Sequence, residues 1–214
     1  MINNLIVGAS LLTLTHLSTS HPSANIIGPV LSARSMSLQT RQPDRFVNGV
    51  FKDNILLNLN YLSGGVQSKD EINWDKINQA QSSEFRLNPG EVFAFHDDLL
   101  PEYRGRVVRT TNAHFNYSDG FKSDGYLSGD GVCHLASLIN WAARDANLLV
   151  ESPTNHNFAN IPEVPRQYGV SIYDGPGASI GDEKQNLYIT NNYNKPVTFR
   201  FNYQDSILTV IVSI

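Results

Sequence analysis

The sequence predicts an α+β fold with a single domain. In it, an antiparallel sheet packs against a central helix that carries the only cysteine, Cys133, at its N-terminus, and a second packing helix lies at the N-terminal end of the domain. A chain of 214 residues is long enough for one good hydrophobic core and short for two. Two segments carry apolar residues at helical spacing, and the C-terminal third has the pattern of short strands separated by turns.

The N-terminal residues predict export. Residues 1–20 have the pattern of a signal peptide, because the apolar run Leu5–Leu17 is too short to span a bilayer and is followed by small serines. A buried N-terminal helix or strand is the alternative. Residues 21–44 mix Pro, Ser and Gly without a clear period, which predicts a leader or loosely ordered arm. We therefore expect a folded domain at 45–214, an extracytoplasmic (secreted or cell-wall associated) location, and no integral membrane span after signal removal.

The first half of the domain combines a helix, two strands and a long loop. Residues 46–62 approximate helical spacing, and Ser63-Gly64-Gly65 supplies the stop. Residues 82–97 alternate apolar and polar side chains around Asn88-Pro89-Gly90, which predicts two short strands joined by a turn. Residues 101–129 are rich in Gly, Asp, Ser, Asn and Tyr, as expected of an irregular surface loop, and long loops are often functional.

The C-terminal third predicts a small antiparallel sheet. Residues 168–179, 185–203 and 206–214 have the pattern of strands broken by turns. The asparagines between Asn191 and Pro196 indicate a hairpin within the middle segment.

The central helix begins near Gly131 and places its cysteine away from its apolar face. At about 100° per residue, the apolar stripe consists of Leu135, Leu138, Ile139, Ala142, Ala146 and Leu149. Cys133 lies on the opposite side with Ser137, Asn140 and Arg144. A structural cysteine would be expected on the apolar stripe, so the pattern favours a nucleophile.

The first turn of a helix supplies part of what such a nucleophile needs. Unpaired N–H groups and the positive end of the helix dipole favour a thiolate and can hold an oxyanion. A thiol of pKa ~8.5 needs about 2.7 kcal/mol to fall by two pKa units, whereas a helix terminus gives only ~0.3–1 kcal/mol. Asp130, expected as the helix N-cap, would oppose ionisation further. A histidine partner is therefore required.

His156, in the segment that follows the helix, is the first choice for the general base, because that segment can return antiparallel to the N-terminus of the helix. A solvent-facing loop histidine is its alternative. His134 is adjacent to Cys133, and neighbours on a helix point about 100° apart, so it pairs poorly with the thiol. His96 and His114 lie in turn-rich segments, where a structural role is favoured.

Composition excludes several other classes of protein. Sixteen basic and twenty acidic residues give a formal net charge of −4 with no Lys/Arg run, so we expect no nucleic-acid partner. One cysteine excludes an internal disulfide, and no Cys/His cluster offers a zinc site. We expect neither a metal nor a cofactor.

Four segments form a recognisable pattern: "LNPGEVFAFHD" at 87–97, "GDGVCHLASLINWAARDANLLV" at 129–150, "NHNF" at 155–158 and "NLYITNNYNKPVTF" at 186–199. In this order they resemble the VanW-like family, which is named after an accessory protein of vancomycin-resistance gene clusters. The resemblance is most specific at Val132-Cys133 and extends roughly from residue 45 to the C-terminus. The sequence differs from the family pattern at Asp130, where glycine is usual, and at His134, where glutamine is usual.

The resemblance implies a role in peptidoglycan metabolism, since some VanW-like proteins are regarded as cysteine L,D-transpeptidases. By matching position, Cys133 would be the nucleophile and His156 its base, with peptidoglycan stem peptides as the partner. The candidates for forming the oxyanion site or orienting the base are His134, with the backbone amides of residues 133 and 134, Ser137 and Asp174. Asp174 would replace an aspartate of the family pattern, and Tyr126 and Asn155 are the candidate substrate-binding residues.

Two other interpretations remain open. A non-catalytic module would keep the fold and bind peptidoglycan, or act at the cell surface, through the loop from Tyr103 to Tyr126. A structural surface protein would hold Cys133 as a buried, inert thiol, which slow alkylation of the native protein would reveal.

Overall fold

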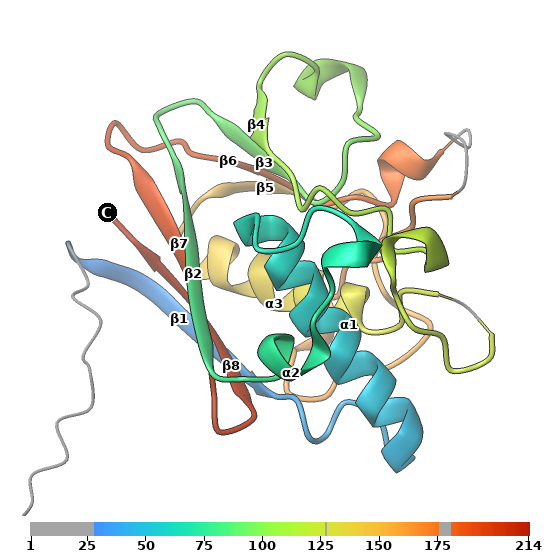
Figure 1. Ribbon diagram of the computed structural model, residues 1–214. Helices are drawn as coiled ribbons and strands as arrows, with labels where there is room; N and C mark the ends of the chain where they lie inside the picture. The colour runs from blue at the N-terminus through green and yellow to red at the C-terminus, as the bar shows by residue number, and fades with distance from the viewer. Residues whose placement is uncertain (1–27, 127, 176–180) are drawn as a thin grey trace, which may run out of the picture.

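Two four-stranded sheets and two long helices form the domain, seen in a computed structural model that describes residues 28–126, 128–175 and 181–214 (Figure 1). Sheet A is antiparallel throughout, in the order β1-β8-β7-β2. Its strands are β1 (Val30–Ser37), β2 (Gln81–Leu87), β7 (Val197–Gln204) and β8 (Ile207–Ser213).

Sheet B is smaller and has the order β4-β3-β6-β5, with only the β3–β4 pair parallel. Its strands are β3 (Val92–Ala94), β4 (Val107–Arg109), β5 (Leu149–Glu151) and β6 (Tyr188–Thr190). The expected α+β class is confirmed, with two antiparallel-rich sheets in place of one.

The helix α1 (Arg45–Ser63) has a side-chain cap at its start and stops at the glycine that the sequence predicts. The side chain of Asp44 accepts a hydrogen bond from the amide of Val47, and Gly64 closes the helix with φ 76°, in the left-handed region. A single short turn, α2 (Trp74–Ile77), follows. Five 3₁₀ turns complete the helical elements of the described chain: η1 (Lys69–Glu71), η2 (Pro101–Tyr103), η3 (Tyr117–Asp119), η4 (Arg166–Tyr168) and η5 (Asp182–Lys184).

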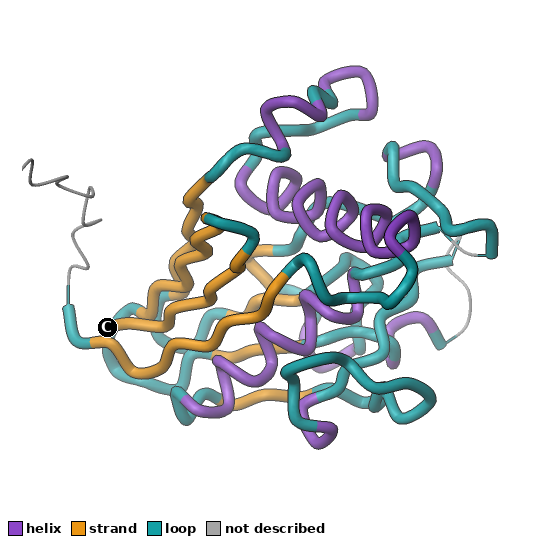
Figure 2. Tube along the Cα trace, turned by 90° about the horizontal axis from the view of Figure 1, so that it is seen from below, coloured by secondary structure: helices purple, strands orange, loops and turns teal. Residues whose placement is uncertain are grey.

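The helix α3 (Val132–Asp145) lies at the centre of the domain, where it packs against β1 and β8 of sheet A, against β5 of sheet B and against α1 (Figures 1 and 2). Its predicted stripe is buried from Leu135 to Ala146. Leu149 is an exception, because it lies on β5 and is 61% exposed.

Residues 30–37 form β1, although we expected 21–44 to be a loosely ordered arm. β1 pairs antiparallel with β8, which places the first and last described strands side by side. Its alternating pattern is hard to recognise because serine occupies a buried position. There the hydroxyl of Ser32 donates to the carbonyl of Ala142, 2.6 Å away on α3. The expected signal peptide lies outside the described residues.

Two strand predictions in the C-terminal third are wrong. The segment around Asn191 is a crossover between sheets and not a hairpin, since β6 belongs to sheet B and β7 to sheet A. The side chain of Asn191 holds this crossover by donating to the carbonyls of Leu87 at 2.9 Å and Lys195 at 2.8 Å. The actual hairpin joins β7 to β8 through Asp205 and Ser206, both with positive φ, as a tight two-residue turn requires. Residues 169–175 form no strand.

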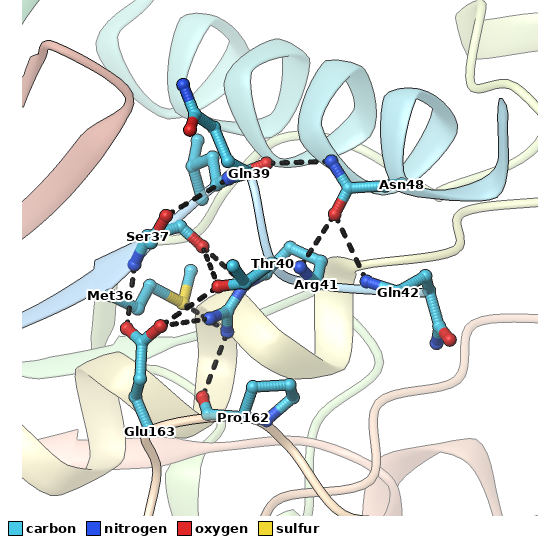
Figure 3. A network of polar contacts seen from close by, with 10 residues as sticks. Met36, Ser37, Gln39, Thr40, Arg41, Gln42, Asn48, Pro162 and Glu163 are labelled. Atoms are coloured by element: carbon cyan, nitrogen blue, oxygen red, sulfur yellow. Dashed lines mark hydrogen bonds and ion pairs between the residues drawn. The ribbon is translucent and has the colours of Figure 1, made fainter. Parts of the chain in front are cut away.

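A buried arginine connects the end of β1 to the loop that precedes η4 (Figure 3). The guanidinium of Arg41 donates to the carbonyls of Ser37 at 2.7 Å and Pro162 at 3.1 Å, and pairs with the carboxylate of Glu163 at 3.1 Å. Arg41 is 1% exposed, so these contacts replace the water that its charge would otherwise hold.

Candidate active site

Cys133 is the second residue of α3, and a glycine sets its position. Gly131 is the N-cap with φ 100°, and a Cβ atom there would lie 2.7 Å from the carbonyl oxygen of Phe51 on α1. Only glycine permits both this backbone conformation and this approach of the two helices. The expected N-cap, Asp130, instead accepts a hydrogen bond from the amide of Asp124 at 3.1 Å.

A cavity of about 240 Å³ opens beside this helix start. Its walls come from the first turn of α3, from α1 and from the loops around residues 115, 156–160 and 172–174. It brings together four residues that the sequence singled out, which are Cys133, His134, His156 and Asp174.

Backbone groups of Ile172 engage the thiol of Cys133. The amide of Ile172 lies 3.4 Å from Sγ, and Sγ lies 3.6 Å from the carbonyl oxygen of the same residue. Burial raises the pKa of Cys133 to about 11, and the negative charge of Asp130 adds to the rise. The protein in its free state therefore holds a neutral thiol at physiological pH.

The polar face of α3 that carries Cys133 is covered by the segment 168–172. Three side chains on successive turns of the helix each form a hydrogen bond with the backbone of every second residue of this segment. These backbone groups are therefore engaged by the helix and do not pair with a strand. Ser137 and Asn140 are consequently fully buried, and Ser137 contacts the carbonyl of Cys133 and not the thiol. The three bonds are Ile172 N to Cys133 Sγ, Val170 N to Ser137 Oγ and Asn140 Nδ2 to Tyr168 O.

The hydrogen bond of the His156 ring defines a tautomer suited to a base. Its Nδ1 lies 3.1 Å from the carbonyl oxygen of Ala159, which can only accept, so Nδ1 carries the proton and Nε2 has the free lone pair. Burial lowers the pKa of His156, which keeps the ring neutral at physiological pH. Among the described residues, no hydrogen bond joins the ring to Cys133.

The ring of His134 is 4% exposed and packs edge-on against Phe51 and His156, with ring centroids 5.0 and 6.3 Å apart. Its Nδ1 is buried without a hydrogen-bond partner. Burial lowers the pKa of His134 to about 3, and the charges of Arg41 and His156 act in the same direction.

Only one of the two expected oxyanion donors is free. The amide of His134 donates to the carbonyl of Gly131 at 3.0 Å. The amide of Cys133 bonds no other residue within the described ranges and contacts only the sulfur of its own side chain, so it remains the available donor at this helix start.

Asp174 lies at the edge of the cavity, among other ionisable groups. Burial raises its pKa to about 6; His114 opposes this rise, and Asp98, Asp97 and Asp182 add to it. Its Oδ2 is buried without a hydrogen-bond partner, and no hydrogen bond links Asp174 to His156 in the part of the chain that the structure describes. Two groups of potential metal-ligand atoms share this residue, with atoms within 4.8 Å of one another: Asp97/His114/Asp174 and Asp98/Asp174/Asp182.

The candidate substrate-binding residues lie outside the cavity. Tyr126 is 91% exposed, and Asn155 has a buried side-chain oxygen without a partner. Sequence reasoning missed the aromatic walls formed by Phe51, Phe115 and Phe158. Only Phe158 carried a signal, since it lies two residues after His156.

Residues 76–213 match the family model described as VanW like protein. The match covers well over half of the chain, so the chain belongs to the VanW-like family. No curated protein and no solved structure matches it. Within the described residues, no helix has the length and apolarity needed to cross a membrane.

Proposed function

We propose that this VanW-like protein is an extracytoplasmic, cysteine-dependent acyltransferase that acts on peptidoglycan stem peptides in the manner of an L,D-transpeptidase. One observation carries the proposal: the thiol of Cys133 and the ring of His156, whose Nε2 is free to accept a proton, line the same cavity beside the amide of Cys133, which bonds no other residue of the described chain. A nucleophile, a base and an oxyanion donor in one cavity are the minimum that acyl transfer needs.

The proposed reaction has two steps. The sulfur of Cys133 attacks the carbonyl of an L,D amide bond, and its proton passes through Nε2 of His156 to the departing amine of the D-amino acid. An S–C bond forms and a C–N bond breaks, which leaves a thioester. An amine of a second stem, or water, then attacks the thioester: a C–N or C–O bond forms, the S–C bond breaks, and a proton of the attacking group passes through His156 to the sulfur.

The pKa shifts of Cys133 and His156 support a proton transfer that occurs during the attack and not before it. Moving a proton from a thiol of pKa about 11 to a histidine whose pKa lies below 6.5 costs at least about 6 kcal/mol. These shifts favour a neutral thiol in the free protein, so in the proposed reaction the proton leaves as the sulfur attacks. The substrate must also displace the contacts between the thiol and Ile172.

Intact-mass spectrometry of the purified chain incubated with tetrapeptide and pentapeptide stems tests the proposal. We expect the mass of an acyl adduct on the wild-type protein, none on Cys133→Ala, and slower adduct formation in His156→Ala. His114→Ala is the matched control, because His114 is half-exposed and does not line the cavity. No adduct with any stem, or one that persists in Cys133→Ala, would contradict the proposal.

A non-catalytic peptidoglycan-binding module is the second candidate. The three bonds between α3 and the segment 168–172 favour it, because they give Cys133 an architectural role equivalent to that of Ser137. In that case stem peptides would bind Cys133→Ala as tightly as the wild-type protein, and neither would form an adduct. Calorimetric titration of the two proteins measures this.

A further inference from the structure

The side chains of the cavity wall that are charged at physiological pH have one sign, because both of its histidines are held neutral. Two carboxylates, Asp130 and Asp174, line it, and no lysine or arginine does so among the described residues. Asp174 continues into a group of carboxylates that includes Asp98 and Asp182, with oxygen atoms within 4.8 Å of one another. A ligand carboxylate would therefore be repelled, and a ligand cation attracted.

The positive charge of Arg41, which lowers the pKa of the cavity residue His134, does not turn the cavity into a site for anions. Its guanidinium is engaged by two carbonyls and by Glu163, as Figure 3 shows, and Arg41 is not part of the cavity wall. The positive charge is compensated within this network, so it offers no site for an anion.

Two residues that line the cavity carry a buried polar atom without a hydrogen-bond partner among the described residues. His134 is 4% exposed and its Nδ1 has no partner, while Oδ2 of Asp174 is buried and likewise unpartnered. An ammonium group carries three donors and no acceptor, which matches carboxylate oxygens and an imidazole lone pair. The rings of Phe51, Phe115 and Phe158 supply apolar walls for the methylene chain that carries such a group.

We propose that this cavity binds a primary ammonium group on a peptide side chain through Asp174, Asp130 and His134. The assignment of that group to the acceptor stem, whose amine resolves the thioester, rests on the proposed function. The binding itself does not, because it needs no thiol chemistry.

The test uses the Cys133→Ala chain, which keeps the cavity and cannot react, in buffer that contains EDTA. The probes are Nα-acetyl-lysine methylamide, which has one ammonium group and no carboxylate, and its Nε-acetylated counterpart. We expect NMR titration to show saturable binding of the first probe only. Loss of a charge-assisted hydrogen bond in Asp174→Asn should weaken that binding about tenfold or more.

Asp130→Asn should weaken binding in the same direction, and it remains informative if Asp174→Asn fails to fold. The matched control is Asp75→Asn, which removes an exposed carboxylate on α2. Equal binding of both probes, unchanged affinity in both cavity variants, or shifts produced by Ca²⁺ in a separate EDTA-free titration and not by the amine would overturn the inference. An acyl adduct on the wild-type chain without amine binding would refute this inference alone, whereas amine binding without any adduct would refute only the proposed acyl transfer.

Discussion

The ionisation of Cys133 is the property that most directly tests how this site works. In the folded chain the pKa of the thiol is raised from 9.0 to about 11, chiefly by burial and further by Asp130. Two pKa units correspond to about a 100-fold smaller thiolate fraction at any pH below the lower value. Because only the thiolate is alkylated, native Cys133 should react with iodoacetamide about 100-fold more slowly than the same residue in the urea-unfolded chain.

The assay is the alkylation rate as a function of pH, followed by intact mass. We expect a midpoint near 11 for the wild-type protein and a lower midpoint for Asp130→Asn, which removes a repelling charge. His156→Ala should leave the midpoint unchanged, since no hydrogen bond joins the two residues in the described chain. This comparison separates a resting thiol from a preformed ion pair.

A midpoint at or below ~8.5 that rises in His156→Ala would refute the reasoning. It would mean that the free protein already holds an activated Cys–His pair, and that the contacts to Ile172 do not control the thiol. The estimated cost of proton transfer, and the conclusion that the proton moves during attack, would then be wrong.

Three further predictions concern stability. Gly131→Ala should lower the free energy of unfolding by more than 2 kcal/mol in urea titration, because its Cβ would clash with backbone, whereas Gly105→Ala, also with positive φ but in open space, should cost only about 1 kcal/mol. Ser137→Ala should cost about 1–3 kcal/mol, since the buried amide of Val170 loses its acceptor; no loss would show that this bond is replaced. Asp174 has a folded pKa raised to about 6, so its contribution to stability is present below pH ~3.8 and lost as pH rises through about 6. The free energy of unfolding of Asp174→Asn should therefore be higher than that of the wild type by about 1–3 kcal/mol near pH 7.5 and nearly equal to it near pH 3.5. Thermal melts at the two pH values measure this difference.

Local signals in the sequence predicted the elements whose ends are determined by nearby residues. The helix at 46–62 and its stop at Gly64 follow from apolar spacing and a glycine that accepts positive φ, and the strands on either side of Asn88-Pro89-Gly90 follow from alternation. The start of α3 could be located for the same reason. Each of these predictions depends on residues within one or two turns of chain.

Elements determined by distant partners could not be predicted in this way. β1 exists because β8 pairs with it and because Ser32 finds a carbonyl on α3. Asn191 holds a crossover between sheets, although its composition is typical of a hairpin.

The candidate site likewise has features that depend on nearby residues, which were predicted, and features that depend on distant residues, which were not. The placement of Cys133 at a helix start is a local feature and was predicted. The segment 168–172, which buries the polar face of α3, lies more than thirty residues after Cys133. The sequence therefore predicted a polar face but could not show that Asn140 on it is buried. The charge of the cavity depends on Asp174, which is also remote from Cys133 in the chain.

The pairing of β1 with β8 constrains the order in which the molecule can fold. Sheet A joins the first described strand to the last, and the amide of Ile214 still donates to the carbonyl of Pro29 beyond the ends of both strands. Contacts of such high sequence separation form slowly, because most of the loop-closure entropy must be lost before they contribute any stability. During synthesis β1 has no neighbour until β8 is made, and β7 keeps one edge unpaired until then, so a partly synthesised chain presents unpaired strand edges. We therefore expect this domain to fold only after its last strand has emerged, and to be prone to aggregation until then.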